Sequence, residues 1–194
     1  MTSSSATTPP ADAVLPDRSQ RAVAPGQPMP RHYSECFVCG DQVGGLGMRS
    51  VAGDDLTVRA EFVVSSAHQG APGLIHGGLL AAAFDEVLGA LNWLVGAPAV
   101  TARLETDFRA PVPVGSTVVI VASIRGVSGR KVYGSAQAHI VSDDAEPILA
   151  AEAAALFIQV PIEHFTTHGT PEFVARARHD ADRNGIMEQF DLNP

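Results

Sequence analysis

The stretch from Leu79 to Val95 is apolar almost throughout, and two adjacent acids, Asp85 and Glu86, lie near its middle. Its apolar residues are distributed around every side of the helix that the stretch predicts, which is the pattern of a helix buried on all faces. A carboxylate inside such a helix loses its hydration unless a specific partner holds it. We therefore interpret the acids as part of a functional site and not as surface charge.

The predicted helix runs from about Gly77 to Leu94. Gly96 suits the left-handed conformation that often follows a helix, and Pro98 prevents the helix from continuing. The C-terminal end of this helix is thus well marked in the sequence.

Gly78 and Asp85 are seven residues apart, so at about 3.6 residues per turn they share one stripe of the helix, roughly 10 Å apart along its axis. Glu86 points away from this stripe. The unpaired N–H groups of the first turn allow Gly77 and Gly78 to hold a carbonyl oxygen that gathers negative charge. Asp85 supplies a base, but roughly 10 Å is too far for both groups to reach one carbon from the same copy of the helix. A second subunit would close this gap.

The chain has 194 residues, of which 45% are hydrophobic, and this is enough for one core of about 130 residues. The first 30 residues are rich in Ser, Thr, Pro and Ala and have too few hydrophobic residues to fold alone, which predicts a disordered tail at 1–30. They contain no apolar segment like that of a signal peptide. We place one domain at 31–162 and a C-terminal helical extension at 163–194. Within the extension, Pro171 predicts the start of a surface helix that reaches about Arg183.

The charged residues argue against nucleic-acid binding and against a membrane span. The net charge of -8 disfavours nucleic acid, and the sequence has no zinc-finger or helix-turn-helix pattern to offset it. Asp85 and Glu86 would each cost about 2.5–3.5 kcal/mol at the centre of a membrane span, so no span is expected. The sequence predicts a cytoplasmic protein.

Five segments carry the alternation or the β-branched composition of strands. They are Leu56–Val64, Ala99–Ala110, Ser116–Arg125, Arg130–Ser142 and Pro147–Val160. A sheet of antiparallel neighbours that curls around one apolar helix buries that helix most economically. In the second of these strands, strict alternation places Thr101 on the charged face with Arg103 and Glu105. The predicted fold class is an α+β roll.

Several motifs in this order resemble the hotdog-fold acyl-CoA thioesterases, in the branch that includes carboxyl-terminal modulator protein. They are Cys36-Phe37-Val38-Cys39-Gly40 with Gly45-Leu46, Gly73-Leu74-Ile75-His76-Gly77-Gly78, Asp85, Thr101-Ala102, Phe108-Arg109-Ala110-Pro111-Val112-Pro113 and Gly129-Arg130-Lys131. The resemblance covers roughly residues 33–160. It implies a hotdog fold, with an antiparallel five- to six-stranded sheet wrapped around one long central helix.

The resemblance also implies hydrolysis of an acyl-CoA thioester to a carboxylate and free coenzyme A. Asp85 is then the general base or the nucleophile, and the N–H of Gly78 polarises the thioester carbonyl. Thr101 helps to position the water, and His76 orients the loop or the thioester. The expected assembly is a homodimer or a dimer of dimers with active sites between subunits.

Coenzyme A itself is expected to contact Gly77, Arg130 and Lys131, with the two cations facing its phosphates. A thiol leaving group with a pKa near 8.5 departs without a strong general acid, so we expect no cofactor other than the coenzyme A of the substrate. No metal is expected either. Cys36 and Cys39 form a single C-x-x-C motif, and zinc would have to recruit distant histidines such as His32 or His68.

Two other functions remain open at this level. One is a hotdog acyl-CoA hydratase or dehydratase, and the other is a non-catalytic acyl-CoA-binding protein. The sequence also leaves open the acyl chain, the choice between dimer and tetramer, and whether Asp85 attacks directly or through water.

Overall fold

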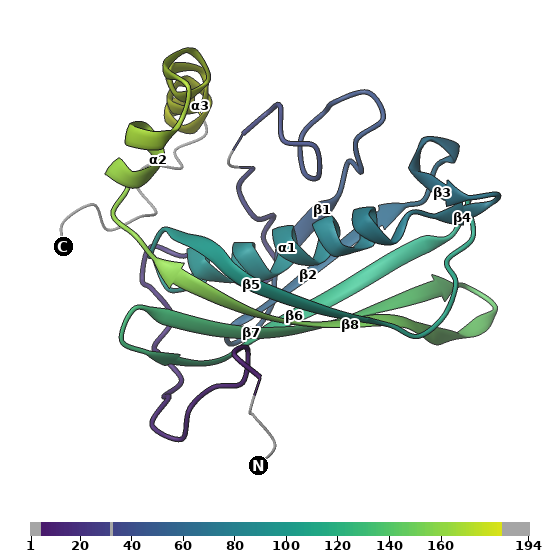
Figure 1. Cartoon of the computed structure of the whole chain (residues 1–194), viewed down its shortest axis with the longest axis horizontal. Helices are drawn as coiled ribbons and strands as arrows, with labels where there is room; N and C mark the ends of the chain where they lie inside the picture. The colour runs from purple at the N-terminus through teal and green to yellow at the C-terminus, as the bar shows by residue number, and fades with distance from the viewer. Residues whose placement is uncertain (1–4, 32, 184–194) are drawn as a thin grey trace.

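In the computed structural model of the chain, one antiparallel sheet of six strands curves around helix α1 (Gly77–Leu94) (Figure 1). The structure describes residues 5–31 and 33–183. The strands follow the order β1-β2-β6-β7-β8-β5 across the sheet. They are β1 (Arg49–Ala52), β2 (Thr57–Val63), β5 (Ala99–Phe108), β6 (Thr117–Ser128), β7 (Lys131–Ser142) and β8 (Ala145–Gln159), and a separate two-stranded sheet pairs β3 (Gln69–Ala71) with β4 (Leu74–Ile75). The predicted α+β class is confirmed.

Helix α1 has the bounds that the sequence predicts, and Gly96 after it adopts a left-handed φ of 69°. One side of the helix packs on the sheet, where Phe84, Leu88 and Leu91 are at most 1% exposed. Gly134 in β7 allows this close packing, because a Cβ there would lie 3.0 Å from a methyl carbon of Leu88. The opposite side, which includes both acids, is only half-buried in a single chain. The expectation of a helix buried on all faces is therefore met on one side only.

A β-bulge in β5 changes which way Thr101 faces. Thr101 pairs with Phe157 of β8, but the next paired residue, Arg103, meets Leu156, so β5 has one extra residue here. Phe157 is buried in the core beside α1, and Thr101 opposite it therefore faces the helix, whereas Arg103 faces the other side of the sheet. The uniform alternation predicted for this strand is wrong at this point.

The N-terminal segment (residues 5–31) packs against the domain, which corrects the prediction of a disordered tail over this range. Ser5 and Thr7 bind Glu105 on the face of the sheet that is remote from α1. Further along, Val14 forms a bridge with Val127, and the buried Met29 donates its N–H to Ser50 of β1. The segment is too polar to form its own core, but it gains these contacts from a sheet that is already folded.

Glu105 gives this attachment a pH dependence. Hydrogen bonds from Ser5, Thr7 and Arg103 lower the pKa of Glu105 from its ordinary 4.5 to about 2. The lowered pKa means that the contact stabilises the fold fully above about pH 4.5, and that this contribution is lost as the pH falls towards 2. An NMR titration of the Glu105 carboxyl should show a midpoint near 2. A double Ser5→Ala, Thr7→Ala variant should move the midpoint towards 4.5, and an unchanged midpoint would contradict the assignment.

Two helices follow the sheet, α2 (Glu163–His168) and α3 (Pro171–Arg183), and α3 begins at the predicted proline. Arg176 of α3 forms an ion pair of 2.6 Å with Glu35, which links this helix to the N-terminal part of the domain. Residues 184–194 of the predicted extension lie outside the described residues. Among the helices that the structure describes, none has the length and apolar character needed to cross a membrane.

Candidate active site

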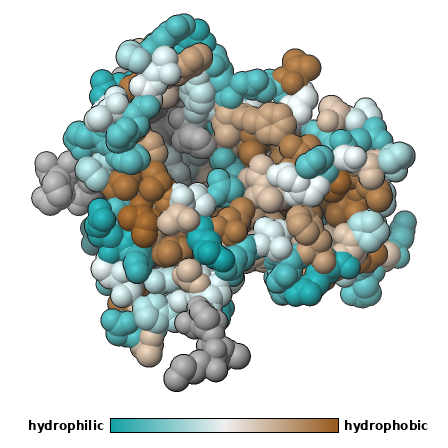
Figure 2. Space-filling model, in the orientation of Figure 1, coloured by the Kyte–Doolittle hydropathy of each residue, from teal (hydrophilic) through white to brown (hydrophobic). Residues whose placement is uncertain are grey.

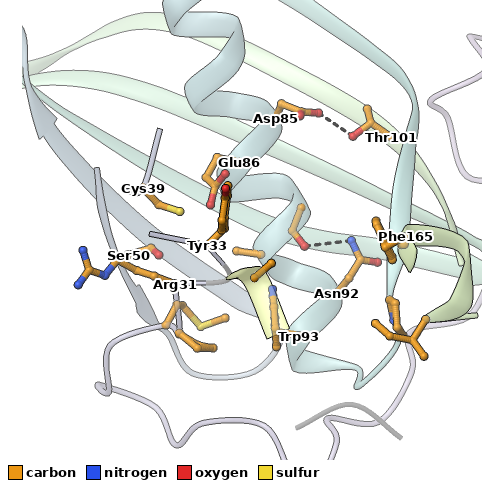
Figure 3. A pocket seen from close by; sticks show the side chains of 18 of the residues that line it. Arg31, Tyr33, Cys39, Ser50, Asp85, Glu86, Asn92, Trp93, Thr101 and Phe165 are labelled. Atoms are coloured by element: carbon orange, nitrogen blue, oxygen red, sulfur yellow. Dashed lines mark hydrogen bonds between the residues drawn. The ribbon is translucent and has the colours of Figure 1, made fainter. Parts of the chain in front are cut away.

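Asp85 and Thr101 meet where α1 faces the bulge of β5. The Thr101 hydroxyl donates a hydrogen bond of 2.7 Å to Oδ1 of Asp85 (Figure 3). This bond depends on the bulge, because strict alternation would place Thr101 on the other face of the sheet. The structure thus brings together two of the residues that the sequence singles out, and it leaves Oδ2 of the carboxylate for another partner.

His76 caps the N-terminus of α1. Its Nδ1 accepts a hydrogen bond of 2.9 Å from the N–H of Gly78, the amide expected to polarise a carbonyl. Gly70 of β3 holds His76 closely, since a Cβ on Gly70 would lie 2.6 Å from the His76 Cα. The ring of Phe108 lies beside Gly77. In this arrangement the Gly78 amide becomes available to a ligand only if the imidazole moves aside.

A cavity of about 900 Å³ lies between α1, the loop and strand residues before it, and the two C-terminal helices (Figure 3). Asp85, Glu86 and Thr101 form part of its wall. Most of the other lining side chains are apolar, among them Met29, Met48, Trp93, Phe157, Phe165 and Phe173. The open surface on this side of the molecule carries apolar patches separated by polar residues (Figure 2). The cavity therefore offers a largely apolar site for a ligand.

Asn92 is a polar residue within this wall and is only 4% exposed. Its Nδ2 donates to the carbonyl of Gly89, while Oδ1 has no partner among the described residues. A buried acceptor of this kind gains about 1–3 kcal/mol when a donor reaches it. Because Oδ1 itself is buried, a ligand in the cavity does not touch it unless the Asn92 side chain turns.

The remaining predicted site residues do not line this cavity in the single chain. His76, Gly77 and Gly78 lie at the start of α1, and Arg130 and Lys131 are exposed at the turn between β6 and β7. Within a single chain, the Asp85 carboxylate and the amides of Gly77 and Gly78 therefore lie apart and do not form one site. This agrees with the separation of roughly 10 Å expected from the helix geometry.

A cluster that the sequence analysis did not assemble lies next to Asp85. The side chains of Cys36, Cys39 and Glu86 converge, with one ligand atom of each within 4.8 Å of the others. Of the two histidines considered for the cysteines, His32 lies outside the described residues. His68 is buried elsewhere, where it bonds the N–H of Ser65 and the carbonyl of Gly45. In the sequence, the one indication that Glu86 belongs to a site is its position next to Asp85.

A long central helix wrapped by an antiparallel sheet, with a carboxylate on the helix facing a cavity, defines a hotdog-fold protein. Residues 72–144 match the family model of the thioesterase superfamily. The family predicted from the motifs is confirmed.

Curated relatives that match the chain carry the name acyl-coenzyme A thioesterase, among them THEM4 and THEM5. THEM4 of Xenopus laevis is 38% identical over 92 residues, which cover 47% of this chain and 40% of the relative. THEM5 of Homo sapiens is 33% identical over 136 residues, which cover 69% of this chain and 52% of the relative. The chain thus spans about half or less of the length of these relatives.

Among solved structures, the smu.793 protein of Streptococcus mutans, determined with acetyl-CoA bound, superposes with a TM-score of 0.52. It is 16% identical, and the match covers 57% of this chain and 86% of that one. At this level of identity the likeness confirms the hotdog fold alone.

Proposed function

We propose that this protein is an acyl-CoA thioesterase, which hydrolyses an acyl-CoA thioester to a carboxylate and free coenzyme A. The observation that carries the proposal is the Asp85–Thr101 pair, set into the wall of a largely apolar cavity. The superfamily match and the two relatives named as acyl-coenzyme A thioesterases support it. The cytoplasm is the compartment that we propose for this activity.

In the proposed reaction, Thr101 fixes Oδ1 of Asp85 so that Oδ2 is directed at the substrate or at a water molecule. In the water route, Asp85 takes a proton as the oxygen of water bonds to the thioester carbon, and the C–S bond then breaks. The thiolate leaves with the electron pair and is protonated afterwards from Asp85 or solvent. In the direct route, Asp85 itself displaces the thiolate to form a mixed anhydride, which water hydrolyses. Both routes use the same two residues.

The carbonyl oxygen needs a donor that the same chain does not place beside Asp85. We propose that this donor is the Gly78 N–H of a second subunit, reached after the His76 imidazole turns away from it. His76 then orients the loop or the thioester. Strand β5 lies at the edge of the sheet, and its outer edge has no neighbouring strand among the described residues. Such an edge is suited to pair with its counterpart in a homodimer, which would also be the unit of a dimer of dimers.

We further propose that Arg130 and Lys131 contact the phosphates of coenzyme A and that Gly77 lies against the bound thioester. The reaction needs no cofactor beyond the coenzyme A of the substrate. The apolar residues of the cavity receive the acyl group.

The proposal is tested by mixing the purified protein with acyl-CoAs of graded chain length and measuring released thiol with a chromogenic reagent. We expect thiol release well above buffer, together with the matching carboxylate by mass spectrometry. Because His76 occupies the Gly78 amide in this structure, a non-catalytic acyl-CoA-binding protein is the second candidate. Tight binding without thiol release would favour that candidate, and a change in enoyl absorbance with crotonyl-CoA would indicate a hydratase.

Replacing Thr101 by valine should lower kcat by roughly 10- to 150-fold. The change removes a hydrogen bond to a charged group, which is worth about 1.5–3 kcal/mol, while it keeps the shape of the side chain. Thr101→Ser retains the hydroxyl and should keep most of the activity. Steady-state thiol release by the two variants checks this, and equal activity in both would contradict the role of the hydroxyl.

Replacing Arg130 and Lys131 together by alanine should raise KM for acyl-CoA about tenfold or more, because charge-assisted contacts to phosphate are lost. The KM for the same acyl group on N-acetylcysteamine, which has no phosphates, should not change. Arg125→Ala, which removes an exposed cation from β6, serves as the matched control. An equal rise in KM for both substrates would exclude phosphate contact.

A further inference from the structure

The C-x-x-C turn directs both of its sulfur atoms at α1. Cys36 lies at a distance of 3.5 Å from Oε2 of Glu86, and its thiol donates to that carboxylate. The Cys39 sulfur is buried and points towards Glu86 as well (Figure 3). Residues from a loop and from the central helix, 47 or more positions apart in the sequence, therefore present two sulfur atoms and one carboxylate to a single point.

The backbone around this cluster is held firmly in place. The N–H of Gly40 donates to the Cys36 carbonyl at 2.9 Å, and the N–H of Cys36 donates to the Tyr33 carbonyl at 3.1 Å. A Cβ on Gly40 would collide with the carbonyl oxygens of Ser34 and Cys36, so this turn requires glycine. The backbone positions of the two cysteines are thus set by the fold.

Without a cation, the surroundings of the cluster favour the neutral thiol of Cys39. The hydrogen bond with Cys36, burial and the negative charge of Glu86 all raise the pKa of the Cys39 thiol. The three groups together would carry three negative charges if all were ionised. A divalent cation at their centre reverses this situation, because it stabilises each ionised form.

We propose that Cys36, Cys39 and Glu86 bind a divalent cation of the zinc class. Zinc bonds of about 2.3 Å to sulfur and about 2.0–2.2 Å to carboxylate oxygen place tetrahedral sulfur and oxygen ligands about 3.6 Å apart. The 3.5 Å between Cys36 Sγ and Glu86 Oε2 agrees with this spacing. On binding, two metal–sulfur bonds and one metal–oxygen bond form, and the two thiol protons leave to solvent. The fourth position is left for water or for a group outside these three.

The bound cation would fasten the turn to α1 at the residue next to Asp85. Cys39 and Glu86 also form part of the cavity wall, so the cation would fix that wall on the side of the base. A Cys36–Cys39 disulfide is the competing use of a C-x-x-C pair. Formation of this disulfide would remove the Cys36 thiol that contacts Glu86, whereas a cation would bind both sulfur atoms and the carboxylate together. The observed convergence therefore favours a cation.

The test uses the full chain, expressed with added zinc and purified without chelator. We expect about one zinc per protomer by elemental analysis and, after exchange, a thiolate-to-cobalt charge-transfer band with Co²⁺. Cys36→Ser and Cys39→Ser should abolish that band, and Glu86→Gln should weaken zinc affinity about tenfold or more. Glu61→Gln, which changes an exposed glutamate of β2, should retain the metal.

The wild-type protein alone is sufficient to overturn the proposal, so the result does not depend on whether a variant folds. Folded wild-type protein that binds neither zinc nor cobalt would do so. A Cys36–Cys39 disulfide in protein purified under reducing conditions, or a cobalt spectrum unchanged in Cys36→Ser, would do so as well. None of these measurements depends on catalytic activity, and the metal site and the proposed hydrolysis can fail separately.

Discussion

Asp85→Asn lowers kcat for acyl-CoA hydrolysis by about a hundredfold or more, the scale of a positioned acid or base. Asparagine has nearly the same shape and can still accept the hydrogen bond from Thr101, so the site should keep its geometry. It cannot take a proton from water or displace a thiolate. Thiol release from the best acyl-CoA substrate, measured beside the wild type, gives the ratio directly.

The matched control for this variant is Asp143→Asn, which changes an exposed acid in the turn between β7 and β8. It carries the same change of charge away from α1 and should leave kcat within about twofold of wild type. If Asp85→Asn and Asp143→Asn had the same kcat, Asp85 would not be the base or the nucleophile.

The second large effect is on stability. Phe84 is completely buried between α1 and the sheet, directly before the catalytic candidate in the sequence. We expect Phe84→Ala to lower the free energy of unfolding by about 3–5 kcal/mol, because the change removes a large apolar side chain and leaves a cavity. Chemical denaturation at a fixed protein concentration measures this loss, and the fixed concentration matters if unfolding is coupled to dimer dissociation.

Phe173→Ala is the comparison for this prediction, since Phe173 on α3 is 47% exposed. Its loss should cost far less than that of Phe84, because little apolar surface returns to water. Equal losses in the two variants would mean that α1 does not form the centre of the core. In that case the placement of Asp85 on α1 would also need revision.

The helix and the main strands were predictable because each has a local signal. Gly96 and Pro98 mark the end of α1, and the strands β2 and β5 to β8 carry β-branched residues or alternation. Strand β1 has four residues, too few to show a period. Its pairing with β2 is a tertiary contact that propensity does not encode.

The Asp85–Thr101 pair shows where local patterns are insufficient. Alternation alone assigns Thr101 to the wrong face, and only the bulge opposite Phe157 turns it towards the helix. The role expected for Thr101 came from the family resemblance and not from the strand pattern. A bulge depends on how β8 pairs with β5, and a single strand carries little sign of it.

The N-terminal segment and the cysteine cluster depend on contacts over long sequence separations. Ser5 reaches Glu105 and Cys36 reaches Glu86, so neither contact has a spacing that reveals it. Composition predicts that the N-terminal segment cannot fold alone. It does not show that the outer face of the sheet supplies the missing contacts.

The most direct test of a two-subunit site is complementation between two inactive variants. Asp85→Asn removes the base, and Gly78→Pro removes the amide hydrogen in the first turn of α1, where proline is tolerated. The two chains are co-expressed with different tags, and the mixed dimers are purified through both. If the site combines Asp85 of one subunit with Gly78 of the other, each mixed dimer has one intact site and about half of the wild-type activity. Mixed dimers that are as inactive as their parents would contradict the account.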